Sequence, residues 1–219
     1  MDIKVFNDIS YGMYVVSSKN DKNVGCFINT LVQITSNNPM VSISVNKDNY
    51  TNKCIKESNR FAVSVLKEDS TDKIISIFGY SSSLDKDKFA DVEYENVMGL
   101  PVVVEDMCSY IVCDLVNVVD CGSHDLFIGK VKESKKLNDD RPMTYRYYHE
   151  VLKGKSPKNA PTYVELSNDK QDNSSSLYQC SICGYIYDDS KEEIPFLELP
   201  DDWVCPRCGV GKEYFSKIS

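Results

Sequence analysis

Apolar and polar residues alternate along much of residues 1–166, with the period of two that is typical of β-strands. Segments with this pattern are rich in β-branched and aromatic residues, and we expect strands at 14–16, 27–34, 41–45, 61–66, 102–104, 110–119 and 126–131. Two segments show helical spacing instead. Thr51 is expected to cap a helix through Cys54 and Ile55, and Ser70 or Thr71 to cap a second one. Many strands with few helices predict a closed or nearly closed β-barrel.

The alternation stops near residue 167. Residues 167–176 contain no apolar side chain, so we expect a flexible linker there. The linker divides the chain into a larger domain, residues 1–166, and a smaller module, residues 177–219. A module of this size rarely folds on its own apolar core, so we expect a metal or a disulfide to stabilise it.

Composition narrows the class of protein. The chain has 219 residues, of which 42% are hydrophobic, and a net charge of −8 with no basic cluster, which argues against disorder and against nucleic-acid binding. It begins without a leader-like apolar segment, and no apolar run reaches the roughly 20 residues of a membrane-spanning helix. We therefore expect a soluble, cytoplasmic protein. In such a chain, the nine cysteines predict metal ligands or small buried residues before disulfides.

Four of the cysteines form two motifs in the smaller module, Cys180-x-x-Cys183-Gly and Cys205-x-x-Cys208-Gly. Each motif can place two thiolates on one metal, and its glycine allows the tight turn that points backbone N–H groups at sulfur. The module contains no histidine, so the predicted site is all-thiolate and tetrahedral, which leaves zinc or a single iron. The spacing alone favours a structural zinc ribbon, whereas the many aromatic residues around the motifs favour a shielded redox metal.

Together with Tyr185, Tyr187, Leu199, Trp203 and Phe215, these motifs resemble rubredoxin. The resemblance implies one iron held by Cys180, Cys183, Cys205 and Cys208. Such a centre has no open coordination position, so it can only take up and release one electron. Another group must therefore supply that electron.

The larger domain contains neither a dinucleotide-binding glycine motif nor a P-loop. Small polar residues stand at the ends of its predicted strands, at Asn29-Thr30, Ser44 to Lys47 and Asn49 to Thr51. N–H groups at the start of the helix that begins at Thr51 favour an anion such as a phosphate monoester, and Lys47 adds a positive charge. The alternative is an ordinary β-turn that leads into a capped helix.

In their order along the chain, these residues resemble the flavin reductase-like family. The segments Tyr11–Val16, Phe61–Leu66 and His124–Gly129 extend the resemblance. It implies a mainly β fold, an FMN-binding split β-barrel with short helices, normally a homodimer, followed by the small metal-stapled rubredoxin-like β module. It also implies that the flavin phosphate and ring edge are held by Asn29, Thr30, Gln33, Ser44, Val45, Asn46, Lys47, Asn49 and Thr51.

The remaining histidine, tyrosine and cysteine candidates also have expected roles. His124 is a candidate catalytic residue that would approach the flavin or a nicotinamide; the favoured interpretation is a strand-end histidine bonded to a neighbouring carbonyl. Tyr145, Tyr147 and Tyr148 are interpreted as core or dimer packing rather than flavin stacking. Inert packing is expected for the remaining cysteines, Cys26, Cys54, Cys108, Cys113 and Cys121.

The two halves together predict an electron-transfer chain. A flavin accepts two electrons as a hydride, a four-thiolate iron accepts one, and a short linker keeps the two centres at a high effective concentration. The donor would be NAD(P)H, directly or through an NAD(P)H:rubredoxin reductase. Fusions of this kind resemble the high-molecular-weight rubredoxins of anaerobes, which implies a flavodiiron protein that reduces oxygen or nitric oxide as the acceptor. The alternatives are a flavin reductase that releases reduced flavin and carries a structural zinc ribbon, and a redox-silent flavin-binding sensor.

Overall fold

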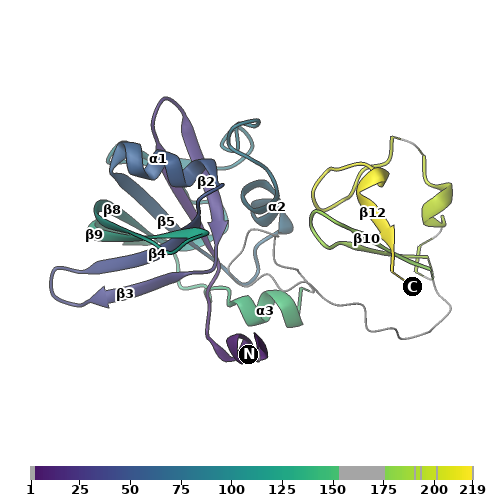
Figure 1. The fold of residues 1–219 in the computed structure, drawn as a ribbon, viewed down its shortest axis with the longest axis horizontal. Coiled ribbons are helices and arrows are strands. Elements are labelled where there is room, and N and C mark those ends of the chain that lie inside the picture. The colour runs from purple at the N-terminus through teal and green to yellow at the C-terminus, as the bar shows by residue number, and fades with distance from the viewer. Residues whose placement is uncertain (1–2, 153–175, 190, 193, 201, 219) are drawn as a thin grey trace. The chain divides into compact units, whose positions relative to one another are not determined.

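The computed structural model describes residues 3–152, 176–189, 191–192, 194–200 and 202–218 (Figure 1). The chain divides into two compact units, Met1–Leu152 and Lys153–Ser219. The predicted linker, residues 167–176, lies outside the described residues apart from residue 176, so the linker and the boundary at residue 166 stay predictions. None of the helices in the described ranges is long and apolar enough to cross a membrane.

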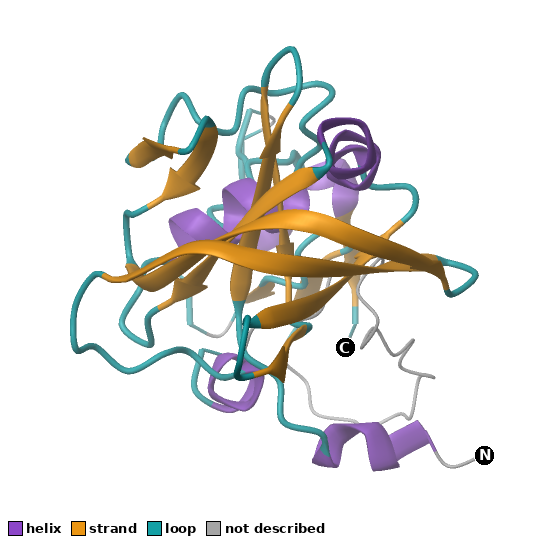
Figure 2. Cartoon of the chain, turned by 90° about the vertical axis from the view of Figure 1, so that its left-hand side faces the viewer, coloured by secondary structure: helices purple, strands orange, loops and turns teal. Residues whose placement is uncertain are grey.

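A seven-stranded antiparallel sheet forms the larger unit, in the order β2-β1-β5-β8-β9-β4-β3. Its strands are β1 (Tyr14–Lys19), β2 (Asn23–Ile28), β3 (Leu31–Thr35), β4 (Met40–Asn46), β5 (Arg60–Leu66), β8 (Met107–Asp120) and β9 (His124–Lys136). The two edge strands, β2 and β3, are joined by Asn29 and Thr30 alone. Because so short a connection spans at most about 11 Å, the two edges meet there. The sheet therefore curls into the predicted split β-barrel, across which β8 and β9 form a long curved hairpin (Figure 2).

The predicted strand at residues 27–34 is wrong, because the chain turns at Asn29 and Thr30 and changes from one sheet edge to the other. A second hairpin, β6 (Tyr94–Val97) with β7 (Leu100–Val103), was predicted only in part, as a strand at 102–104. β8 and β9 also extend beyond the predicted 110–119 and 126–131. The extra residues at the end of β9, 132–136, are exposed, so hydrophobic patterning does not detect them, whereas the extra residues Met107 and Cys108 at the start of β8 are buried.

The interior of the barrel is filled by apolar side chains from six strands and one helix. They are Val16, Cys26, Ile28, Val41, Ile43, Val45, Ile55, Phe61, Val63, Cys113 and Phe127. Burial of an aliphatic or aromatic side chain contributes about 1.5–3 kcal/mol relative to exposure. Packing is close enough that a Cβ added at Gly129 would lie 2.4 Å from Cζ of Phe61.

The larger unit also contains short helices: η1 (Ile3–Asp8), α1 (Tyr50–Ser58), α2 (Asp72–Tyr80) and α3 (Tyr145–Glu150). The predicted cap of α1 is wrong: the N-cap is Asn49, whose Oδ1 accepts a hydrogen bond of 3.0 Å from the Thr51 N–H. Thr71, one of the two predicted positions, is the N-cap residue of α2, but its side chain makes no capping bond and Oγ1 donates to Oδ2 of Asp106 at 3.2 Å instead. The helix α3 was not predicted, but its Tyr148 is buried in the core with Met13 and Phe78, which confirms core packing for that residue.

Side chains cover the outer edge of β2. The Gly25 N–H donates to Oγ of Ser83 (3.2 Å), and the Gly25 carbonyl accepts bonds from Oγ of Ser83 (3.1 Å) and Nζ of Lys88 (2.9 Å). Lys88 also donates to the Phe78 carbonyl at 3.2 Å. The segment after α2 is thereby fixed against this edge of the sheet.

The smaller unit is a three-stranded sheet in the order β11-β10-β12 with two short 3₁₀ helices. Its elements are β10 (Leu177–Cys180), β11 (Ile186–Asp188), η2 (Phe196–Glu198), η3 (Lys212–Tyr214) and β12 (Phe215–Lys217). Four buried side chains, Tyr178, Tyr187, Phe196 and Leu199, make up its core, and the ring of Phe196 stacks on that of Tyr178 at 4.3 Å. So small a core agrees with a unit that a metal stabilises.

Candidate metal centre and flavin site

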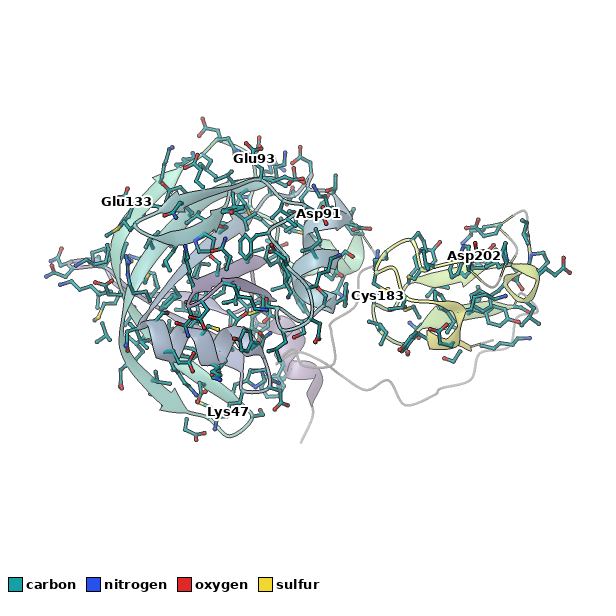
Figure 3. All side chains as sticks on the ribbon, turned by 90° about the horizontal axis from the view of Figure 1, so that it is seen from above. Lys47, Asp91, Glu93, Glu133, Cys183 and Asp202 are labelled. Carbon is teal, nitrogen blue, oxygen red and sulfur yellow. The ribbon has the colours of Figure 1, made fainter. Side chains whose placement is uncertain are left out.

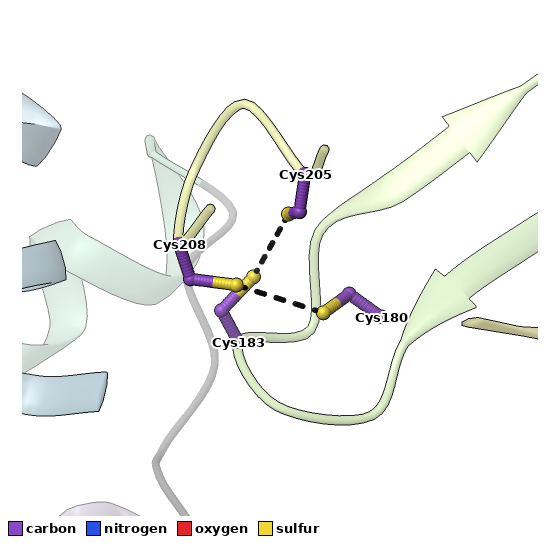
Figure 4. Close-up of side chains that lie close together, drawn as sticks. All are labelled: Cys180, Cys183, Cys205 and Cys208. Carbon is purple, nitrogen blue, oxygen red and sulfur yellow. Dashed lines mark hydrogen bonds between the residues drawn. The ribbon is translucent and has the colours of Figure 1, made fainter. Parts of the chain in front are cut away.

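Four sulfur atoms converge in the smaller unit (Figure 4). The Sγ atoms of Cys180, Cys183, Cys205 and Cys208 all lie within 4.8 Å of one another. Cys180 and Cys208 are 3.8 Å apart at sulfur, and Cys183 and Cys205 are 3.5 Å apart. A tetrahedral site with metal–sulfur bonds of about 2.3 Å has sulfur–sulfur edges of about 3.8 Å. The four residues therefore fit one tetrahedral ion, iron or zinc, with little rearrangement.

Each cysteine pair stands on a tight turn of the same form. The N–H of Gly184 donates to the Cys180 carbonyl at 2.9 Å, and the N–H of Gly209 donates to the Cys205 carbonyl at 2.8 Å. Both glycines have positive φ, 73° and 75°, a conformation that residues with a Cβ adopt only with strain. The glycines that the motifs contain are thus required by the backbone of the turns.

Backbone N–H groups surround the sulfurs. Those of Arg207 and Cys208 bond to the sulfur of Cys205, and that of Tyr185 bonds to the sulfur of Cys183. A hydrogen bond from the Cys183 thiol, together with these N–H groups, lowers the pKa of Cys205. The same bond raises the pKa of Cys183, which keeps the shared proton. Because the ligands of a metal here are thiolates, metal binding would release the thiol protons.

Solvent reaches the four cysteines unequally. Cys180, Cys183 and Cys205 are each 1% exposed, whereas Cys208 is partly exposed. An ion in this cluster would be shielded from water on most sides and would lie closest to solvent at Cys208.

All but one of the residues predicted to hold flavin lie around the split of the barrel, which is the region of the β2–β3 connection and the turn from β4 to α1. Asn29 and Thr30 form the connection between the two sheet edges, and Thr30 is fixed to Ser44 on β4. Oγ1 of Thr30 donates to the Ser44 carbonyl and accepts from the Ser44 N–H, both at 3.1 Å. Gln33 is further along β3, where it is exposed and donates to the Thr35 carbonyl at 3.2 Å.

The side chains of Val45 and Thr51 point into the protein interior, where they are 1% and 0% exposed. Asn46 and Asn49 form the turn between β4 and α1: the Asn49 N–H donates to the Asn46 carbonyl at 3.1 Å. The N–H groups of Thr51 and Asn52 are both bonded to Asn49, to its Oδ1 and its carbonyl. Two N–H groups at the start of α1, which we expected to be open to an anion, are thus already satisfied.

Lys47 lies at the surface of the larger unit (Figure 3), where Nζ is 2.5 Å from Oδ1 of Asp120 and 3.9 Å from Oδ1 of Asp125. The bond to Asp120 raises the pKa of Lys47 and lowers that of Asp120. Asp125 is buried and accepts bonds from Asn52 (2.9 Å) and Lys56 (2.5 Å) on α1. Neither aspartate was predicted as a site residue, because each is far from its lysine partners along the chain.

His124 is the first residue of β9 and pairs with Asn46 on β4. Its Nδ1 lies 2.9 Å from Oγ of Ser123, so its bonded neighbour is a hydroxyl rather than the expected carbonyl. Nε2 is buried and makes no hydrogen bond within the described part of the chain. The ring therefore has one buried nitrogen without a hydrogen-bond partner among the described residues.

The remaining cysteines behave as predicted, with one correction. Burial raises the pKa of Cys26 to about 11 and that of Cys113 to about 12, so these thiols stay protonated and inert. Cys54 and Cys108 are also buried. Cys121 is exposed in the turn between β8 and β9, because the barrel core ends before this turn.

Comparison with known proteins agrees with this architecture. Residues 6–154 match the model of the flavin reductase like domain, and residues 177–215 match that of rubredoxin. The chain is 40% identical to the high molecular weight rubredoxin of Moorella thermoacetica, over 100% of both chains. It is 37% identical to a ferric-chelate reductase (NAD(P)H) of Archaeoglobus fulgidus, over 75% of this chain and 99% of that protein.

Among solved structures, the NADH:FAD oxidoreductase of Streptomyces globisporus superposes with a TM-score of 0.59 at 24% identity. The match covers 64% of this chain and 84% of that one, and it concerns the fold of the larger unit. The two family matches together span most of this chain, and the high molecular weight rubredoxin aligns with it over the full length of both. The chain therefore belongs to the flavin reductase-like family, in the form that carries a carboxy-terminal rubredoxin domain.

Proposed function

We propose that this oxidoreductase passes electrons from NAD(P)H through FMN in the larger unit to one iron in the smaller unit, and then to a separate acceptor protein. The proposal is supported by the union of a flavin reductase-like domain and a rubredoxin domain in one chain. It is also supported by the 40% identity to the high molecular weight rubredoxin of Moorella thermoacetica over the full length of both chains.

The cluster of four sulfurs is the observation that carries the proposal. Four thiolates fill the coordination sphere of a tetrahedral ion, so a substrate has no position on the metal. Bound iron would supply one-electron chemistry at this site, and zinc would supply none. The N–H groups directed at the sulfurs of Cys183 and Cys205 reduce the cost of added negative charge. They would thereby raise the reduction potential of an iron held there.

FMN would supply the step from hydride transfer to single electrons. We assign its binding to the nine residues named above, all of which except Gln33 lie around the split of the barrel. Lys47 would hold the phosphate, and Asn29 and Thr30 would lie along the ring edge. Nε2 of His124, a buried nitrogen that no described residue bonds, would face the flavin or a nicotinamide.

The acceptor in this proposal is a flavodiiron protein that reduces oxygen or nitric oxide. The donor is NAD(P)H, used directly or through an NAD(P)H:rubredoxin reductase, and the chain acts in the cytoplasm as a homodimer. The exposed carboxylates of the smaller unit, Glu192, Glu198, Asp202 and Glu213, would steer an acceptor with a basic face. Added salt should then slow transfer to the acceptor without slowing reduction of the flavin.

A second activity is suggested by the ferric-chelate reductase of Archaeoglobus fulgidus. About 75% of this chain aligns with 99% of that protein. We infer that the larger unit also reduces ferric chelates. This activity does not need the sulfur cluster, so it should survive loss of the metal. The related alternative, release of free reduced flavin beside a structural zinc, is distinguished by metal analysis.

The test is an anaerobic stopped-flow reaction with NADH that records the flavin and iron absorption bands together. Elemental analysis should find one iron per chain. With NADH, or with NADH and a reductase, the iron band should bleach after the flavin band in the same molecule. A colourless protein with zinc, or an iron that stays oxidised beside fully reduced flavin, would contradict the relay.

The variant Cys208→Ser removes one metal ligand, and Cys121→Ser is its matched control because Cys121 is an exposed thiol outside the cluster. Cys208→Ser should lose the iron bands and delivery to the acceptor but keep reduction of flavin and of ferric chelates. Cys121→Ser should match the wild type in all three measurements. Full delivery to the acceptor by Cys208→Ser would refute the proposed route.

A further inference from the structure

Lys47 is the one cationic residue among the nine assigned to flavin binding, and its amine is already paired. Nζ lies 2.5 Å from Oδ1 of Asp120, in an ion pair at the protein surface. The Lys47 side chain is 33% exposed and that of Asp120 is 72% exposed. A ligand phosphate can therefore reach this amine, and water can solvate the Asp120 carboxylate if it is displaced.

The other carboxylate near Lys47 cannot be exchanged in this way. The side chain of Asp125 is only 3% exposed, and Asn52 and Lys56 hold it against α1 at 2.9 Å and 2.5 Å. Its distance of 3.9 Å from Nζ of Lys47 is longer than a hydrogen bond. Of these two carboxylates, only that of Asp120 combines a direct bond to Lys47 with access to water.

Charge and hydrogen bonding around Lys47 are both balanced before a ligand arrives. Two lysines, Lys47 and Lys56, face two aspartates, Asp120 and Asp125, so these four side chains carry no net charge. Asn49 satisfies the N–H groups of two residues at the start of α1. A phosphate monoester therefore has to replace a carboxylate on Lys47 rather than occupy a free cation.

We propose that Asp120 competes with the phosphate of FMN for Lys47, and so sets how strongly the larger unit prefers phosphorylated flavin to riboflavin. The inference rests on the flavin site proposed above. Asp120 lowers the affinity for FMN by the free energy of the ion pair that must be broken. Riboflavin has no phosphate, so its affinity does not depend on this exchange.

The test uses Asp120→Asn in the full-length chain, freed of flavin by dialysis and titrated with FMN and with riboflavin by flavin fluorescence. Oδ1 of Asp120 also accepts a bond of 2.8 Å from the Gly122 N–H, and an asparagine oxygen can keep that bond. The variant should bind FMN about three- to tenfold more tightly, with riboflavin affinity unchanged. The gain should shrink as salt is added, because salt screens exposed charges. Asp120→Glu should restore the affinity of the wild type.

The matched control is Asp139→Asn, which removes the same charge from another exposed ion pair with a lysine, Lys136. Lys136 is at the far end of the 13-residue strand β9 from His124, about 40 Å along the strand. This variant should leave both affinities unchanged. A far-UV circular dichroism spectrum and melting temperature equal to those of the wild type exclude misfolding.

The variant Lys47→Met separates this inference from the proposed function. Weaker FMN binding by Lys47→Met together with unchanged FMN binding by Asp120→Asn would overturn the inference and leave the flavin site in place. Equal tightening of FMN and riboflavin by Asp120→Asn would also overturn it, because the effect would not involve the phosphate. No change of either flavin affinity in both variants would overturn the placement of the phosphate at Lys47 itself.

Discussion

The buried carboxylate of Asp125 joins β9 to α1, and the substitution Asp125→Asn tests how much this bond contributes. Its side chain is 3% exposed and accepts hydrogen bonds from Asn52 (2.9 Å) and Lys56 (2.5 Å). Asparagine has the same size, so the substitution removes the charge without leaving a cavity. Hydrogen bonds to charged groups contribute about 1.5–3 kcal/mol each. Lys56 is partly exposed and can be solvated again, so we expect a total loss of about 1.5–3 kcal/mol.

The effect should depend on pH in a defined direction. Burial raises the pKa of Asp125, but the bonds from Lys56 and Asn52 outweigh it and hold the pKa below its usual range. The folded state thus favours the charged carboxylate. The stabilisation is complete above the unfolded pKa of about 3.9 and is lost as the pH falls through the lower folded value. The difference between wild type and variant should therefore be constant near neutral pH and shrink in acid.

Urea unfolding followed by far-UV circular dichroism measures this difference for the larger unit. The single tryptophan, Trp203, is in the smaller unit, so its fluorescence reports separately on that part of the chain. Asp139→Asn is the control, because it breaks an exposed ion pair and should leave the midpoint unchanged. Equal stability of wild type and Asp125→Asn at pH 7, or a difference that grows in acid, would refute the reasoning.

Four further outcomes are expected. Gly209→Ala, at a φ of 75° with open space around it, should lower the stability of the smaller unit by about 1–2 kcal/mol through backbone strain, measured by Trp203 fluorescence. Gly129→Ala should cost the larger unit about 1–3 kcal/mol, because its Cβ would meet the Phe61 ring; unchanged circular dichroism midpoints would contradict this. Removal of the metal by a chelator should unfold the smaller unit alone. Burial lowers the pKa of Lys88 to about 8, so the free energy of unfolding should rise between about pH 8 and pH 10. This rise should be absent from Lys88→Met when both proteins are unfolded with urea across that pH range.

The four-sulfur cluster could be predicted from the sequence because its geometry is local. Cys180 and Cys183 share one turn, and Cys205 and Cys208 share another of the same form, each ended by a glycine with positive φ. Spacing within a turn determines where the two sulfurs point. Only the meeting of the two turns needs tertiary structure, and the aromatic core around them is also present in the sequence pattern.

Features that depend on distant partners were not predicted. The turn at Asn29 and Thr30 interrupts a continuous apolar run, and the bonds that fix it come from Ser44, 14 positions away. The pairing of Lys47 with Asp120 spans 73 positions. The helix α3 was missed because its tyrosines have weak helix propensity, and burial of Tyr148 in the core stabilises it instead.

The protected side of β2 has a consequence for behaviour at high protein concentration. An open sheet edge can recruit a strand from another molecule and begin aggregation. At Gly25, an incoming strand would first have to displace the hydroxyl of Ser83 and the amine of Lys88. Substitutions that release the segment from Ser83 to Lys88 would therefore expose this edge of β2 and allow it to nucleate intermolecular β-structure.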